Sequence, residues 1–316
     1  MNHLESSFSG KNASWRYLLM ILAVLTASNT IGAIPLFISV GMRSAVDSSV
    51  AGKLAENPND LSVLGVSSNT GLLMMLFPFI VALIAFILLV KPLNGRSLNR
   101  IINGTDSFRW NRFFISALIW MIMSAIYLFG YLKADPSNFS LNNKSATLIP
   151  LILISLLLIP FQAAFEEILF RGYLMQGFTV LLNNRLFPLI MTSILFGLMH
   201  GMNPEVKAFG FWTMLPQYVL FGLIFGIITI MDDGIEAAIG AHAANNAFQC
   251  IMVTNDSSAL QAPALFVQHN VYPWFELSTM ILMGVLIIVV MNKILKWNNF
   301  SEIFARVDRN KIIQVP

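Results

Sequence analysis

Apolar side chains fill eight stretches of the chain, and polar or charged residues separate each stretch from the next. A helix needs about 20 residues to cross the hydrocarbon core of a bilayer. Most of the stretches have this length, although the fifth is short and the seventh contains several polar residues. The predicted spans are Tyr17–Val40, Leu72–Val90, Phe114–Leu132, Leu148–Phe170, Leu186–His200, Phe211–Met231, Gly234–Val253 and Trp274–Leu295.

The overall composition strengthens this interpretation. The 316 residues are 56% hydrophobic and 11% charged, and the mean hydropathy is +0.71. Soluble domains carry about 25% charged residues, and a soluble core could not absorb so much apolar surface. The predicted fold class is therefore an all-α, polytopic transmembrane helical bundle of about eight spans, with the lipid bilayer as its solvent.

The charge and the single cysteine exclude several other classes of protein. The pI of about 9.0 would suit a nucleic-acid partner, but the net charge is only +3. Lys and Arg stand in loops beside apolar stretches, as in membrane proteins, so no nucleic-acid partner is predicted. The lone Cys250 cannot form an intramolecular disulfide, and we interpret it as a small core residue.

The distribution of Lys and Arg predicts the orientation. These residues are frequent in the N-terminal arm, the second loop and the C-terminal tail, whereas the last loop, Thr254–Pro273, has none. By the positive-inside rule, the chain is a multi-pass plasma-membrane protein with both termini in the cytoplasm. The polar loop Gly41–Gly71 is then external.

The chain divides into three parts by its buried polar residues. Residues 1–147 hold three spans with polar loops, and no charged residue lies in the interior of those spans. Residues 148–253 form a core of four helices in which ionisable residues recur. Residues 254–316 comprise an external loop, the last span and a basic cytoplasmic tail.

The fourth span carries the first of these ionisable groups. A charged side chain in mid-bilayer costs at least about 2.5–3.5 kcal/mol. Glu167 and Arg171 are four residues apart and can form an ion pair that supports the helix. Glu166 lies about 100° around the helix, with no basic residue four positions away. A metal or a protonated histidine could stabilise it, and a lone buried carboxylate is suited to proton transfer.

Two histidines in neighbouring spans extend the cluster. His200 ends the fifth span, four residues after Phe196, and His242 shares a face of the seventh span with Asn246. Together with Glu166, these side chains can converge from three helices. We therefore predict Glu166, His200, His242 and Asn246 as catalytic residues, with Glu167, Arg171 and Phe196 in support.

This set permits two kinds of chemistry. Glu166, His200 and His242 match a His₂Glu zinc set with an open position for water. Alternatively, without a metal, Glu166 would deprotonate a water held by the histidines, and Asn246 would donate to the oxyanion. The zinc motif H-E-x-x-H is absent from the sequence. Both a Zn²⁺ cofactor and a metal-free mechanism remain open.

The depth of the residues tests this cluster. If the fourth helix ended at Phe170, Glu166 would lie about 6 Å from the cytoplasmic edge, and His200 about 20 Å deep. The two side chains could not meet. We therefore expect the fourth helix to continue past Arg171 toward Leu182, and Glu166, His200 and His242 to approach one common point.

Three motifs in order resemble one known family. They are Glu166-Glu167-x-x-x-Arg171, Phe196-x-x-x-His200 and His242-x-x-x-Asn246. In order, spacing and placement in apolar helices they are similar to the CPBP family, the CAAX prenyl protease and bacteriocin-processing membrane proteins, also called the Abi family. The resemblance covers roughly Leu148–Val253.

The resemblance implies an all-helical intramembrane endopeptidase. In that family the first glutamate, here Glu166, activates water, and His200, His242 and Asn246 complete the site. Family members cleave prenylated CAAX proteins or are linked to bacteriocin immunity and peptide maturation. The implied partner is a membrane-associated or CAAX-like peptide or protein substrate. Several members are called metalloproteases, and a glutamate-dependent mechanism is also argued for them.

Two other classes of function compete with the protease. A non-enzymatic protein could confer bacteriocin immunity by binding, or act as a scaffold. A transporter could use buried Glu and His as a proton relay. The first three spans lack the polar residues of a transport path, and the chain shows no inverted repeat. A binding protein has no need to keep Glu166 unpaired in lipid, so the enzyme is the favoured interpretation.

Overall fold

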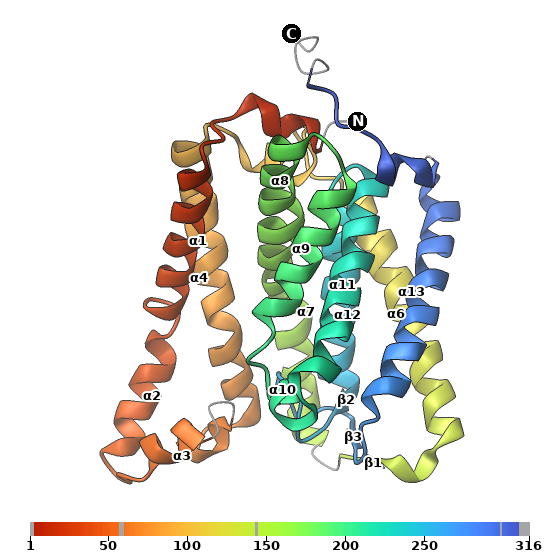
Figure 1. Ribbon diagram of the computed structural model, residues 1–316. Coiled ribbons are helices and arrows are strands. Elements are labelled where there is room, and N and C mark those ends of the chain that lie inside the picture. The colour runs from red at the N-terminus through yellow and green to blue at the C-terminus, as the bar shows by residue number, and fades with distance from the viewer. Residues whose placement is uncertain (1–2, 57–59, 143–144, 298, 310–316) are drawn as a thin grey trace.

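The computed structural model describes residues 3–56, 60–142, 145–297 and 299–309. It is a bundle of helices that run between two ends (Figure 1). The α-helices are α1 (Ser14–Asn29), α2 (Ile34–Ser44), α3 (Val50–Glu56), α4 (Ser68–Asn94), α5 (Leu98–Ile102), α6 (Trp110–Ala134), α7 (Ser145–Glu167), α8 (Met175–Leu182), α9 (Leu186–Met199), α10 (Pro204–Phe209), α11 (Phe211–Asp232), α12 (Glu236–Met252) and α13 (Pro273–Leu295).

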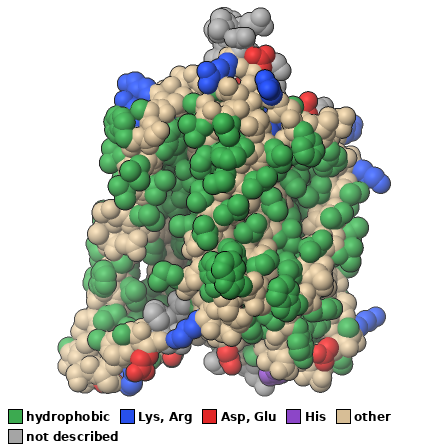
Figure 2. All heavy atoms as spheres, viewed as in Figure 1, with side chains coloured by type: hydrophobic (Ala, Val, Ile, Leu, Met, Phe, Trp, Pro, Cys, Tyr) green, Lys and Arg blue, Asp and Glu red, His purple; other side chains and the backbone are tan. Residues whose placement is uncertain are grey.

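Each of the eight predicted spans is helical, and the predicted fold class is confirmed. Six helical stretches of the described chain are long and apolar enough to cross a membrane, and α9 is a shorter apolar helix. The first predicted span consists of two successive helices, α1 and α2. Figure 2 shows apolar side chains over the middle of one face, with charged side chains mostly toward the two ends.

Local sequence signals fix where these helices begin and end. The side chain of Ser67 accepts a hydrogen bond from the Thr70 backbone and so caps the start of α4. At the other end, Gly95 has a φ of +68° and its N–H bonds the carbonyl of Lys91. Glycine adopts this left-handed conformation without a steric penalty, which makes it a common helix terminator.

The fourth span is one continuous helix in which the turn widens. α7 passes without a break into a π-helical segment, η4 (Ile168–Leu174), and then into α8. The whole span runs over Ala146–Leu182, 37 residues. The expected continuation past Arg171 is confirmed. Single π turns inside α-helices are rare and occur mostly at functional sites.

The N-terminal segment packs on the outer side of this π turn. Residues His3 to Ser9 include the short 3₁₀ helix η1 (Glu5–Ser9), and most of their side chains are buried. The ring of His3 bonds the carbonyl of Arg171 at 3.1 Å, and its backbone N–H bonds Asp233 at 3.0 Å. Gln176 donates to the carbonyl of His3 at 2.7 Å. The segment thus ties η4 to the turn between α11 and α12.

The end of the bundle away from the termini holds the shorter elements (Figure 1). The polar segment 41–71, expected to be a loop, contains α3 and the 3₁₀ helix η2 (Leu61–Leu64). The 3₁₀ helix η3 (Pro136–Asn138) precedes a three-stranded sheet that the sequence did not predict. Its strands are β1 (Phe139–Leu141), β3 (Phe266–Gln268) and β2 (Val253–Thr254), in that order, with β1–β3 antiparallel and β2–β3 parallel. The 3₁₀ helix η5 (Phe300–Phe304) lies at the opposite end.

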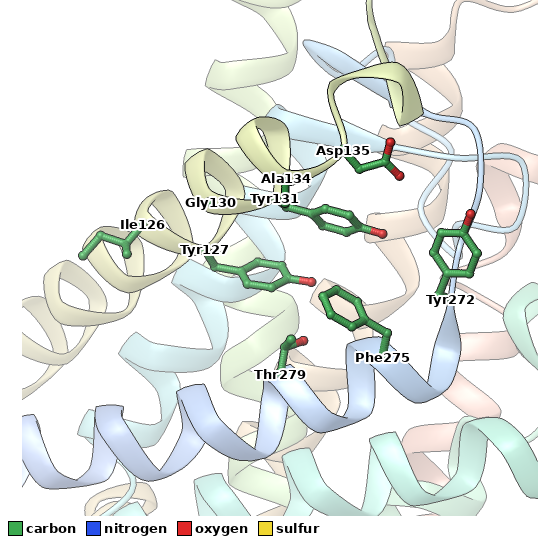
Figure 3. A pocket seen from close by; sticks show the side chains of 9 residues that line it. All are labelled: Ile126, Tyr127, Gly130, Tyr131, Ala134, Asp135, Tyr272, Phe275 and Thr279. Carbon is green, nitrogen blue, oxygen red and sulfur yellow. The ribbon is translucent and has the colours of Figure 1, made fainter.

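An aromatic groove of about 610 Å³ opens between α6 and α13 (Figure 3). Tyr127 and Tyr131 point into it from α6, and Phe275 and Thr279 come from α13. None of the residues that line the groove belongs to the predicted catalytic set.

An ion pair joins the residue before α6 to the start of α12. Glu236 has a fully buried side chain and contacts Arg109, which is 26% exposed, at 2.6 Å. The Arg109 backbone N–H donates to it at 3.1 Å, and Asn103 donates a further bond. The first turn of α12, six residues before His242, is therefore held in place.

We predict that Glu236→Ala destabilises the fold. The change leaves Arg109 with Asp232, 3.2 Å away, as its remaining carboxylate partner. The cost should therefore be smaller than the roughly 3–5 kcal/mol of breaking a fully buried pair, but larger than that of losing an exposed one. The midpoint of thermal unfolding of the purified protein in detergent should fall clearly. The matched control is Glu302→Ala, because the Glu302 side chain is 41% exposed and 3.6 Å from Arg185. Such an exposed pair contributes at most about 1 kcal/mol. Equal shifts in the two variants would contradict the prediction.

Candidate active site

Glu167 lies at the centre of the buried polar cluster. Its Oε1 atom accepts hydrogen bonds from Arg171 Nη1 at 2.9 Å and from His242 Nδ1 at 2.7 Å. The side chains of Glu167 and Arg171 are both 0% exposed. The predicted i,i+4 ion pair is thus present, and it extends to a histidine of another helix. One carboxylate oxygen joins α7, η4 and α12.

Glu166 faces the other nitrogen of the same histidine. Its Oε2 lies 3.6 Å from His242 Nε2, and its Oε1 accepts a 2.6 Å hydrogen bond from Gln162. Glu166 is 8% exposed and His242 is 4% exposed. The imidazole therefore stands between two carboxylates, one at each ring nitrogen. From the sequence, a metal or a protonated histidine was considered as the partner of Glu166, and His242 is the histidine that faces it.

A chain of amide side chains leads to Glu166 from α6. Trp120 Nε1 donates to Asn245 Oδ1 at 3.1 Å, and Asn245 donates to Asn246 Oδ1 at 3.0 Å. Asn246 then donates to Gln162 Oε1 at 3.0 Å, and Gln162 donates to Glu166. Every link points its donor toward the carboxylate, and such chains polarise cooperatively. The chain fixes one oxygen of Glu166 and leaves the other free to react.

His200 lies beside this cluster, and the ring of Phe196 contacts both His200 and His242. The ring centroid of His200 is 4.5 Å from that of Phe196, which is 6.0 Å from that of His242. Nδ1 of His200 bonds the carbonyl of Phe196 at 2.7 Å, and the ring stacks on Tyr218. His200 therefore borders the Glu166–His242 pair across Phe196, while Glu166 and His242 face each other directly.

Aromatic rings enclose the charged groups. The ring of His242 stacks on Phe225 with centroids 4.8 Å apart. The guanidinium of Arg171 lies 4.3 Å from the ring centre of Phe196 and donates to the Gly222 carbonyl at 3.3 Å. A cation over an aromatic face is attracted to the π electrons, most strongly away from water. Phe196 thus contacts Arg171, His200 and His242.

Glu166 and His200 lie at similar depths in the bundle. Both depths can be measured from the turn that joins α8 to α9. Glu166 lies sixteen residues before Leu182 and His200 fourteen residues after Leu186, which is about 24 Å and 21 Å along the two helices. The length of the fourth helix removes the conflict that a helix end at Phe170 would create.

Several residues of the site had no prediction from the sequence. Gln162 could have been found, because it is four residues from Glu166, the same spacing that links Glu167 to Arg171. Trp120, Asn245, Tyr218 and Phe225 reach the site only through the packing of α6, α11 and α12.

The donor set does not fit a three-ligand zinc site. Glu166 Oε2 and His242 Nε2 converge, but a catalytic zinc usually takes three protein ligands. Nδ1 of His200 is bonded to Phe196 and its ring is stacked on Tyr218. In the described parts of the chain, no three His, Cys, Asp or Glu side chains come together to hold a metal.

Comparisons with known proteins agree with the motifs. Residues 145–248 match the family model described as type II CAAX prenyl endopeptidase Rce1-like. The protein YyaK of Bacillus subtilis (strain 168), described as uncharacterized, is 28% identical over 279 residues, which cover 87% of this chain and 90% of that protein. No solved structure matches the chain.

The matched residues include both glutamates, both histidines and Asn246, together with the helices that bring most of them into contact. The chain is thus a multi-pass membrane protein whose core, residues 145–248, is similar to the CAAX-protease-type proteins of the CPBP family.

Proposed function

We propose that the chain is an intramembrane endopeptidase that hydrolyses a peptide bond of a membrane-associated or CAAX-like substrate. The observation that carries the proposal is Glu166. Its Oε1 is fixed by Gln162, its Oε2 faces His242 Nε2 at 3.6 Å, and no hydrogen-bond partner occupies Oε2 among the described residues. A general base needs such an oriented and available oxygen.

In the proposed reaction Glu166 takes a proton from a water molecule. The hydroxide oxygen bonds the carbonyl carbon of the scissile peptide, and the carbonyl π electrons move onto its oxygen. When this tetrahedral species collapses, the C–N bond breaks, and the leaving nitrogen takes the proton from Glu166. The water is thereby divided between the new carboxyl and amine groups.

The neighbouring side chains support these steps. Asn246 uses one amide hydrogen on Gln162, and its second can donate to the developing oxyanion. Glu167 orients His242 through Nδ1, as the acid of a catalytic triad orients its histidine. The carbonyl of Phe196 can only accept a hydrogen bond, so His200 must carry its proton on Nδ1. Its unprotonated Nε2 can then hold the attacking water.

The depth of Glu166 supports a substrate that enters the bilayer. The residue stands near the middle of a 37-residue span, about 24 Å along the helix from the end at Leu182. A folded soluble protein cannot present a peptide bond there. An extended peptide anchored by a lipid or by an apolar segment can do so.

We predict that Glu166→Gln lowers peptide cleavage by at least about 10²-fold, the contribution of a general base. Glutamine keeps the shape and can still accept from Gln162, but it cannot take a proton from water. The assay uses protein in liposomes with a fluorogenic farnesylated CAAX peptide and the same peptide without the farnesyl group.

The matched control is Glu276→Gln, a carboxylate of α13 that bonds Gln268. This variant should cleave as fast as the wild type. If Glu166→Gln retains full biological activity, or if the wild type cleaves no peptide while still conferring immunity to a bacteriocin, the non-enzymatic binding function replaces the protease.

We further propose that no metal takes part, since only two donors converge at Glu166 and His242. Removal of metals with 1,10-phenanthroline and a chelating resin should leave the cleavage rate unchanged. Metal analysis of the active protein should find no stoichiometric zinc. Loss of activity on chelation, with recovery when Zn²⁺ is added back, would contradict the metal-free mechanism.

The orientation is also a proposal: both termini face the cytoplasm. The first and last described segments, η1 and η5, lie at one end of the bundle (Figure 1), and the Lys- and Arg-rich segments before α1, around α5 and after α13 lie at the same end. Cys250 is the only cysteine, and it is buried. A Cys250→Ala background therefore allows single cysteines to report the side of the membrane.

In that background we predict that an impermeant maleimide labels Ser137→Cys on intact cells. It should label Asp106→Cys only after the membrane is permeabilised. Both positions are exposed, and they lie at opposite ends of the bundle. The reverse pattern of labelling would show that the termini are outside.

A further inference from the structure

The ring of His200 is held on more than one side. It stacks on Tyr218 with centroids 4.6 Å apart and an interplanar angle of 21°. Phe196 contacts the ring at 4.5 Å and accepts the bond from Nδ1. Phe196 belongs to the same helix as His200, whereas Tyr218 comes from α11. Tyr218 therefore joins His200 to another helix of the bundle.

The hydroxyl of Tyr218 is fixed in turn. It accepts a hydrogen bond from Asn203 Nδ2 at 3.1 Å and donates one to Glu205 Oε2 at 3.3 Å. Asn203 and Glu205 stand on the turn and on the short helix α10 that follow His200. The phenol ring cannot rotate away from His200 without breaking both bonds.

Glu205 connects this arrangement to a fourth part of the chain. Its second oxygen, Oε1, accepts a 2.8 Å bond from the backbone N–H of Ala259, in the segment between β2 and β3. Burial raises the pKa of the Glu205 carboxyl group, while its backbone and Tyr218 hydrogen bonds and nearby His200 act in the opposite direction. The Glu205 carboxyl group is half-buried and bonded through both oxygens, and the proposed reaction does not use it.

We propose that Tyr218 and Glu205 are positioning residues that fix the ring of His200 and lock it to the segment between β2 and β3. We call the contacts of Tyr218 and Glu205 that fix the His200 ring the clamp. The role of His200 Nε2 in catalysis rests on the proposed function, whereas the clamp concerns only the position of the ring. Nδ1 is hydrogen-bonded to Phe196, and Tyr218 fixes the plane of the ring. Nε2 can therefore point in only one direction. Such fixed geometry saves the cost of ordering the group during each turnover.

Two near-isosteric variants separate the parts of this clamp. Tyr218→Phe keeps the stacked ring and removes the hydroxyl. Glu205→Gln keeps one acceptor oxygen, but its NH₂ group cannot accept the second bond from Tyr218 or Ala259. Tyr218→Leu removes the stacking altogether. Tyr272→Phe, in the groove between α6 and α13, is the matched control for a tyrosine hydroxyl.

Histidine NMR measures the clamp without any substrate. The chain has only four histidines, so ring-labelled histidine gives four sets of signals, and His200→Gln identifies one of them. We expect wild-type His200 to be a single Nδ1–H tautomer. In Tyr218→Phe and Glu205→Gln its signals should shift and broaden, and in Tyr218→Leu they should move further. The signals of His242, held by Glu167, should stay in place and report an intact fold.

Cleavage kinetics provide the second measurement. Tyr218→Phe and Glu205→Gln should each lower kcat by about tenfold with little change in KM, and the double variant should be no slower than either single variant, because the two residues act as one unit. Tyr218→Phe should be faster than Tyr218→Leu, and Tyr272→Phe should match the wild type.

Different results would overturn the clamp and the proposed peptidase function. If the His200 signals are identical in wild type, Tyr218→Phe and Glu205→Gln, the clamp is overturned, even when cleavage depends on Glu166. If the signals change as expected but no variant, including the wild type, cleaves peptide, the clamp stands and the proposed peptidase function fails. Additive losses of kcat would likewise overturn the single-unit clamp.

Discussion

Two side chains from different helices share one carboxylate oxygen at the centre of this bundle. Glu167 Oε1 accepts from Arg171 on the π turn and from His242 on α12, and all three side chains lie out of reach of water. Removing Glu167 or Arg171 would leave the other as a buried charge without its partner, which costs several kcal/mol. The position of α12 relative to the fourth span therefore depends on this contact. Asn246, one turn beyond His242, depends on it indirectly.

The adjacent residue gains its role from this constraint. Because Glu167 points at Arg171, Glu166 must point about 100° away around the helix. There it meets Gln162 and the far nitrogen of the same histidine. Two consecutive glutamates thus divide the work: one holds the histidine, and the other faces it with a free oxygen. The amide chain from Trp120 and the ring of Phe196 keep that geometry from relaxing.

Sequence reasoning succeeded where the signal was periodic or local. The apolar stretches predicted the helices, and the four-residue spacing predicted the Glu167–Arg171 pair. Gln162 has the same spacing from Glu166 but was missed, because only basic partners were sought. Trp120 could not be predicted, because more than a hundred residues separate it from Asn245 and no sequence pattern shows which face of α6 meets α12. Tyr218 could not be predicted either, because its contact with His200 depends on how α11 packs against the end of α9. The π turn and the three short strands also lack a side-chain signature.

The position of His3 has a consequence for the order of assembly. His3 contacts Arg171 and Asp233, 168 and 230 residues later in the chain. The N-terminal segment cannot reach its place until the helices up to α11 have been inserted, and contacts of such long sequence separation form late because of the entropy of closing the loop. The wide turn behind Glu167 is therefore among the last parts of the molecule to become rigid. A nascent chain would hold Glu167 and the groups around it loosely until most of the protein is already in the membrane.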